Sequence, residues 1–177
     1  MTKKETKSSK SIPTGPNYQL YSNERYGYTM EYPKKWEIKW NWENDTPEQE
    51  GSPNQVLHFG VQNEETIFLA AWDNKENLSL VDWCGQQEGC GSILHATSSI
   101  PNARIAGEDA FALVQAGEQS FPRINILFSH EKEIFWLEKT IPTPNPSLTT
   151  FLHILRTFEF DGQVTQDQIP DLASQLK

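Results

Sequence analysis

Apolar and polar residues alternate strictly in two adjacent stretches near the N-terminus. The alternating apolar positions are Tyr26, Tyr28, Met30, Tyr32, Trp36, Ile38, Trp40 and Trp42. A period of two residues is typical of a β-strand with one buried face. Because Pro33-Lys34-Lys35 separates the two stretches, the pattern predicts a β-hairpin over Tyr26–Trp42. We expect its aromatic face to be buried in the core, and we assign Tyr28, Met30, Trp36 and Ile38 to that core.

Further short apolar runs, each bounded by turn residues, predict more strands. They cover Gln55–Gln62, Thr66–Trp72, Ala103–Ile105, Ala110–Gln115, Arg123–Ser129, Ile134–Thr140 and Thr157–Phe160. Short turns join most of them in pairs, which predicts antiparallel hairpins. The run Thr66–Trp72 is apolar on both faces, as expected of a central strand that is covered on both sides.

Two segments have helical patterns. Ser79–Gln87 predicts a short helix with Ser79 as its N-cap. A second helix is predicted from Ser147, where an apolar stripe at positions i, i+3, i+4 and i+7 would face the sheet: Leu148, Phe151, Leu152 and Leu155. The order of strands and helices, with hairpin connections, predicts an α+β fold in which an antiparallel β-sheet is flanked by helices.

The length and charge distribution divide the chain into three parts. At 177 residues it has the size of one domain. We predict a flexible leader over residues 1–17, a folded domain over 18–161 and a polar tail over 162–177. The leader carries four lysines and one glutamate, a net charge of +3. Because the whole chain has a net charge of −9, the remaining residues carry a net charge of −12. An acidic body repels phosphate backbones and argues against nucleic-acid binding, whereas the basic leader could be a solvated linker or touch an anionic membrane.

The two cysteines, Cys84 and Cys90, enclose a short glycine-rich segment. Their spacing does not fit a CxxC redox motif, and no second pair of ligands completes a zinc site. We therefore predict a disulfide, which favours an oxidising compartment. No apolar run approaches the ~18 residues of a membrane span, and no signal-peptide core precedes the domain. The protein is expected to be extracytoplasmic, with an export signal or lipid anchor removed upstream of Met1; the alternative is a cytoplasmic protein.

Catalytic and cofactor motifs are not found in the sequence. There is no Gly-x-Ser-x-Gly elbow, no Walker A loop and no Gly-x-Gly-x-x-Gly after a strand. The histidines are far apart in sequence and form no metal-ligand motif: His58, His95, His130 and His153. We therefore predict no catalytic residue, no metal and no cofactor. Trp42, Trp72 and Trp83 are the candidates for an aromatic-lined ligand cleft, although buried core positions would explain tryptophans equally well.

Three blocks of the sequence resemble the PsbP-like family, named after the extrinsic photosystem II protein. They are the Tyr-Gly-aromatic strand with its Pro-x-x-Trp turn in Tyr21–Trp36, the turn Gly107–Phe111, and the closing helix and strand Phe151–Phe160. The resemblance covers residues 18–161. It implies an α/β/α sandwich around an antiparallel sheet, a fold common in exported or lipid-anchored proteins, without enzymatic activity. Photosynthetic members act as assembly or stabilising partners of a membrane complex.

These observations lead to two functional expectations. The first is a non-enzymatic, extracytoplasmic binding or assembly module with a protein partner at the cell envelope. The second is a domain that binds a small ligand or a glycan in an aromatic-lined cleft.

Overall fold

The computed structural model describes residues 15–43, 53–61, 66–87, 90–115, 121–141, 148–161 and 169–171. Most of the predicted leader and tail lies outside these residues. Within them the chain forms β1 (Tyr18–Asn23), β2 (Tyr28–Pro33), β3 (Glu37–Glu43), β4 (Gln55–Gly60), β5 (Thr66–Asp73), α1 (Leu80–Gln86), α2 (Gly91–Ala96), β6 (Ala103–Ile105), β7 (Glu108–Gln115), β8 (Arg123–His130), β9 (Glu133–Thr140), α3 (Thr149–Arg156) and β10 (Glu159–Phe160).

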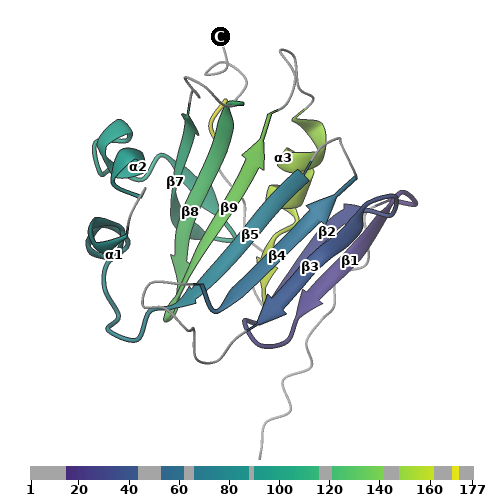
Figure 1. The fold of residues 1–177 in the computed structure, drawn as a ribbon, viewed down its shortest axis with the longest axis horizontal. Helices are drawn as coiled ribbons and strands as arrows, with labels where there is room; N and C mark the ends of the chain where they lie inside the picture. Colours follow the sequence, from purple (N-terminus) through teal and green to yellow (C-terminus); the bar gives the residue numbers. More distant parts are fainter. Residues whose placement is uncertain are drawn as a thin grey trace, which may run out of the picture.

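The strands of the described residues form a large and a small sheet (Figure 1). The large sheet has the order β3-β4-β5-β9-β8-β7-β6, and every pair in it is antiparallel. The predicted hairpins β4–β5, β6–β7 and β8–β9 are confirmed. The closing strand β10 joins the small sheet, whose order is β1-β2-β10. The α+β fold class with an antiparallel sheet is therefore confirmed.

The hairpin predicted over Tyr26–Trp42 is wrong. β2 pairs with β1 and β10, whereas β3 pairs with β4 in the large sheet. A tight turn closed by the bond from the Trp36 amide to the Pro33 carbonyl, at 2.9 Å, carries the chain from one sheet to the other. Alternation reports which face of a strand is buried, but it does not report which neighbour receives the main-chain hydrogen bonds.

Ile38 is not a core residue, because its side chain is 37% exposed. The pairing of β3 with β4 shifts register between Ile38 and Trp40, so Lys39 is an extra residue in the edge strand. Ile38 itself pairs with the core residue Phe59 and so lies on the core face, but β3 is the edge strand of the large sheet, which leaves the side chain partly exposed. The bulge follows Ile38 and interrupts the alternation of faces beyond it. After it, the backbone of Trp40 pairs with His58 and that of Trp42 with Val56. The side chains of residues 39–43 lie outside the described part of the chain. The other assigned core residues, Tyr28, Met30 and Trp36, are buried.

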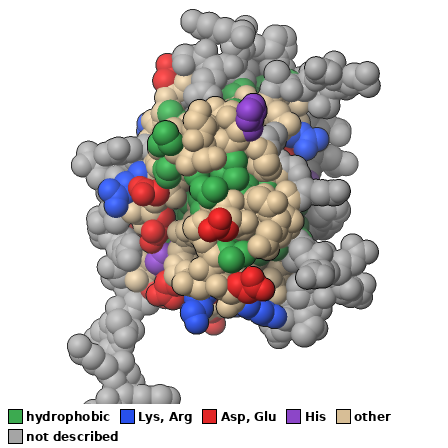
Figure 2. All heavy atoms as spheres, turned by 90° about the vertical axis from the view of Figure 1, so that its left-hand side faces the viewer, with side chains coloured by type: hydrophobic (Ala, Val, Ile, Leu, Met, Phe, Trp, Pro, Cys, Tyr) green, Lys and Arg blue, Asp and Glu red, His purple; other side chains and the backbone are tan. Residues whose placement is uncertain are grey.

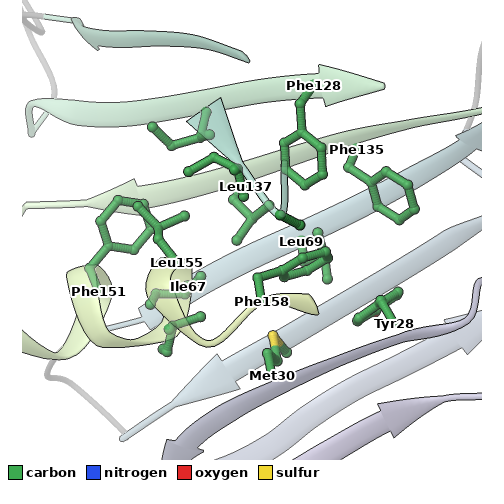
Figure 3. Close-up of a cluster of buried hydrophobic side chains, with 14 of the residues drawn as sticks. Tyr28, Met30, Ile67, Leu69, Phe128, Phe135, Leu137, Phe151, Leu155 and Phe158 are labelled. Carbon is green, nitrogen blue, oxygen red and sulfur yellow. The ribbon is translucent and has the colours of Figure 1, made fainter. Parts of the chain in front are cut away.

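The main core fills the space between one face of the large sheet, helix α3 and the small sheet (Figure 3). Its fully buried side chains come from strands far apart in sequence and include Tyr28, Leu69, Phe128, Phe135, Phe151 and Phe158. The predicted stripe of α3 is confirmed at Leu148, Phe151 and Leu155, while Leu152 is only partly buried. Ile154 is also fully buried, because α3 packs against β2 as well as against the large sheet.

A second, smaller core lies on the other face of the large sheet, under α1 and α2. Helix α1 begins after Ser79, whose hydroxyl accepts a hydrogen bond from the Asp82 amide at 3.1 Å, which confirms the predicted N-cap. Helix α2 was not predicted, because its six residues are too few to show a periodic pattern. The helices on both sides of the sheet give three layers, as the predicted sandwich requires.

Tyr26 connects the small sheet to β5, and this contact predicts a loss of stability in alkaline solution. Its hydroxyl donates to Asp73 at 3.3 Å; burial first, and Asp73 next, raise the pKa of the phenol well above its usual range. The unfolded chain ionises this phenol near pH ~10 while the folded protein keeps it protonated, so stability falls as pH rises above that value. We expect Tyr26→Phe to show a shallower decrease in the free energy of unfolding between pH ~9 and ~11. Parallel denaturant titrations of both proteins measure the slopes, and equal slopes would contradict this assignment.

Candidate functional site

The large sheet carries a cavity on the same face against which α1 and α2 pack. These two helices cover that face only near β7 and β8, and the cavity lies on the part that they leave uncovered. The cavity has a volume of about 370 Å³ and is lined by His58, Thr66, Phe68, Glu138 and Thr140. These residues belong to β4, β5 and β9, which no helix covers in the view of Figure 1. We call this cavity the sheet-face cavity. Phe68 is partly exposed there, so β5 is not fully covered on both faces as its apolar sequence predicted.

Strand register aligns the side chains of the sheet-face cavity in a row across the sheet. His58 pairs with Phe68, Phe68 with Glu138, and Glu138 with Asn125. Residues opposite each other on neighbouring strands point to the same face, about 5 Å apart. Phe68 therefore lies between the imidazole of His58 and the carboxylate of Glu138. Its aromatic ring forms the apolar centre of the cavity floor, with polar side chains on either side.

Most of the polar groups described beside this row have an ion-pair or hydrogen-bond partner, but one buried donor does not. Arg123 forms an ion pair with Glu138 at 3.4 Å. The Oδ1 atom of Asn125 accepts a hydrogen bond from Trp136 Nε1 at 2.9 Å. Within the described residues, however, the Nδ2 atom of Asn125 has no hydrogen-bond partner, although the side chain is only 1% exposed. An unpaired buried donor costs about 1–3 kcal/mol, so this region of the sheet is not optimised for stability alone.

A second surface is formed by the described residues of 78–100, which we call the α1–α2 face. Val81 is 37% exposed and Ile100 is 65% exposed, two of the four large hydrophobic side chains that are exposed among the described residues. Figure 2 shows hydrophobic side chains gathered near the centre of this side of the molecule, with acidic side chains close by. Among the described residues of this face, Asp82 is the one carboxylate, and there is no lysine or arginine. The described face is therefore apolar, with one carboxylate and no lysine or arginine.

The disulfide Cys84–Cys90, predicted from sequence, connects the end of α1 to the start of α2. Both cysteines are fully buried, and they pack in the second core with Phe111, Leu127 and Ile134. The disulfide thus fixes the two short helices to each other and to the sheet. It supplies rigidity that helices of seven and six residues lack on their own.

The three candidate tryptophans have different positions. Trp83 is buried, and its ring meets that of Trp72 edge to face at 5.3 Å, so both belong to the second core. Neither lines the sheet-face cavity. The backbone of Trp42 lies in β3, and its side chain is outside the described residues, so its role as a ligand contact stays a prediction.

The four histidines occupy separate places. His130 stacks on Phe160 and lies 2.8 Å from a Glu108 oxygen. His153 stacks on Tyr18 and lies 2.9 Å from a Glu31 oxygen. His58 lines the sheet-face cavity, and His95 is exposed on α2. In the described part of the chain, no three histidines, cysteines or carboxylates lie close enough to hold a metal ion.

Comparison with known proteins gives a match at the level of structure. No protein-family model and no curated protein matches the sequence. The solution structure of the cyanobacterial PsbP protein, CyanoP, from Synechocystis sp. PCC 6803 matches with a TM-score of 0.50 and 14% identity, over 85% of this chain and 96% of that one. This chain has a PsbP-like fold. The fold predicted from the three sequence blocks is thereby confirmed.

A second solved structure, of a protein from Bacteroides thetaiotaomicron, has a TM-score of 0.48 and 13% identity. It covers 81% of the PsbP-like chain, which spans only 48% of that longer protein. Among the described residues, no helix of the PsbP-like chain is long and apolar enough to cross a membrane.

Proposed function

We propose that this PsbP-like domain is a non-enzymatic binding or assembly module that acts outside the cytoplasm and binds a protein partner through its α1–α2 face. The observation that carries the proposal is the exposure of two apolar residues, Val81 on α1 and Ile100 in the segment that follows α2, next to a buried disulfide that joins the two helices. Exposed apolar side chains on a rigid surface favour protein binding, because little conformational entropy is lost when the partner docks.

The disulfide supports the part of the proposal that places the domain outside the cytoplasm. Bonds of this kind persist in oxidising environments and are rare in the cytosol. The basic leader, with its net charge of +3, would tether the domain near an anionic envelope surface or follow a lipid anchor. Acid-quenched alkylation of protein isolated from its own cells, followed by mass spectrometry, tests this part of the proposal. Two alkylated cysteines would contradict it.

The charge of the domain indicates the chemistry of the partner. Residues 18–177 carry a net −12, and Figure 2 shows acidic side chains close to the apolar ones on this side of the molecule. A complementary partner presents an apolar centre surrounded by lysine and arginine, which would speed association at low salt. The same charge argues against a nucleic-acid partner.

The proposal predicts the effect of charge substitutions on the α1–α2 face. Val81→Arg and Ile100→Arg should each weaken binding at least ~10-fold, since truncating or charging a central contact costs ~2 kcal/mol or more. Both residues are exposed, so the midpoint of thermal unfolding should stay close to that of the parent protein. The binding is measured by co-purification from the envelope fraction of the producing cells.

Phe121→Arg is the matched control, because Phe121 is also a large exposed hydrophobic residue, at 57%, but precedes β8 outside the α1–α2 face. The Phe121→Arg variant should bind the partner as strongly as the parent protein does. Equal recovery of one partner with all three variants would place the interface elsewhere.

A further inference from the structure

We propose that the sheet-face cavity binds one ring of a neutral saccharide. None of its lining residues belongs to the α1–α2 face, so this site is separate from the protein-binding surface proposed above. Its volume, about 370 Å³, lies near the lower limit of ~300–1,000 Å³ for small-ligand sites. It therefore suits a single sugar ring better than an extended chain.

The aromatic centre of the floor suits the apolar face of a sugar ring. Strand pairing places Phe68 between His58 and Glu138 in one row. The face of an aromatic ring is electronegative and attracts the weakly positive C–H groups of a pyranose. The polar residues on either side would then lie level with the hydroxyl groups at the ring edge.

The polar groups of the cavity suit a ligand that both donates and accepts hydrogen bonds. The Thr66 and Thr140 hydroxyls can do both, whereas an ionised Glu138 only accepts. Arg123, at 3.4 Å, stabilises the negative charge of Glu138. A sugar hydroxyl can donate to this carboxylate and accept from a threonine at the same time.

The same groups disfavour other classes of small ligand. An anion would meet the Glu138 carboxylate in a strongly acidic domain, and a purely apolar molecule would cover the two threonine hydroxyls without pairing them. A cation would compete with Arg123 for Glu138. A neutral hydroxylated ring avoids all three penalties.

The test is a titration followed by ¹H–¹⁵N nuclear magnetic resonance. The probes are the methyl glycosides of glucose, galactose, mannose and N-acetylglucosamine, with sodium acetate and toluene as charged and apolar comparisons. At least one glycoside should shift the amide signals of β4, β5 and β9 with a dissociation constant in the millimolar range or below. Acetate and toluene should leave these signals in place.

Variants of the lining residues make the test specific. Thr66→Val combined with Thr140→Val removes two hydroxyls and keeps the branched side-chain shape; we expect affinity to fall at least ~10-fold, since one lost hydrogen bond of ~1.4 kcal/mol gives that factor. Glu138→Gln should weaken binding similarly. Glu131→Gln, in the exposed β8–β9 turn, is the control and should bind like the parent protein.

Two results would overturn the proposal. One is the failure of all four glycosides to shift signals of β4, β5 or β9 at saturating concentrations for a millimolar site. The other is undiminished affinity in the double threonine variant. Neither result bears on the α1–α2 face, because the partner-binding variants Val81→Arg and Ile100→Arg lie outside the cavity.

Discussion

Replacing Phe158 with alanine is expected to lower the free energy of unfolding by about 3–5 kcal/mol. Phe158 is 1% exposed and follows α3 immediately before β10. Its ring stacks on Tyr28 of the small sheet at 4.8 Å and meets Phe128 of the large sheet edge to face at 5.5 Å. Removal of the ring leaves a cavity where α3 and the two sheets meet, and Tyr28 and Phe128 cannot collapse into it without losing their own ring contacts with Phe135.

Equilibrium denaturation by urea measures this loss. Phe121→Ala is the matched control, because that ring is mostly exposed and its removal should change stability by less than ~0.5 kcal/mol. A loss below ~1 kcal/mol for Phe158→Ala would mean that the small sheet and α3 are not packed on the large sheet as described.

Removing the disulfide is expected to lower the free energy of unfolding by about 2–2.5 kcal/mol, the chain-entropy value for a ring of seven residues. The double substitution Cys84→Ala, Cys90→Ala should show this loss, with a further contribution from lost packing since both side chains are fully buried. Because the bond connects α1 to α2, hydrogen exchange should accelerate first in these helices.

Reduction of the unsubstituted protein measures the contribution of the cross-link to stability separately from that of side-chain packing. Denaturation of wild-type protein with and without a phosphine reductant should differ by the cross-link contribution alone. If the reduced and oxidised proteins unfold at the same urea concentration, the disulfide does not stabilise the α1–α2 face.

Local patterns predicted much of the fold. The pairs β4–β5, β6–β7 and β8–β9 follow from short turns between apolar runs, and the N-cap Ser79 follows from its position before an amphipathic run. The pairing of β2 with β1 and β10 was missed, because β10 lies far along the chain and contributes only two residues. Ile38 was assigned to the core because alternation predicts the face on which a residue lies, but not that its strand is at the edge of the sheet.

The candidate sites were harder to predict than the fold. The disulfide was predicted because its two cysteines lie only six residues apart. The sheet-face cavity was not, since its residues come from three strands that strand order brings together. Its only sequence signal is the polar residues His58, Glu138 and Thr140 at alternate positions of β4 and β9. The exposure of Val81 was also missed, because an apolar residue in a short helix is usually buried.

The most direct test of the protein-binding α1–α2 face is photo-cross-linking in the producing cells. A photoreactive amino acid is placed at Val81, at Ile100 or, as the control, at Phe121. We expect one adduct of the same partner mass from positions 81 and 100, and none from 121. An adduct from position 121 alone, or from no position, would contradict the proposed interface.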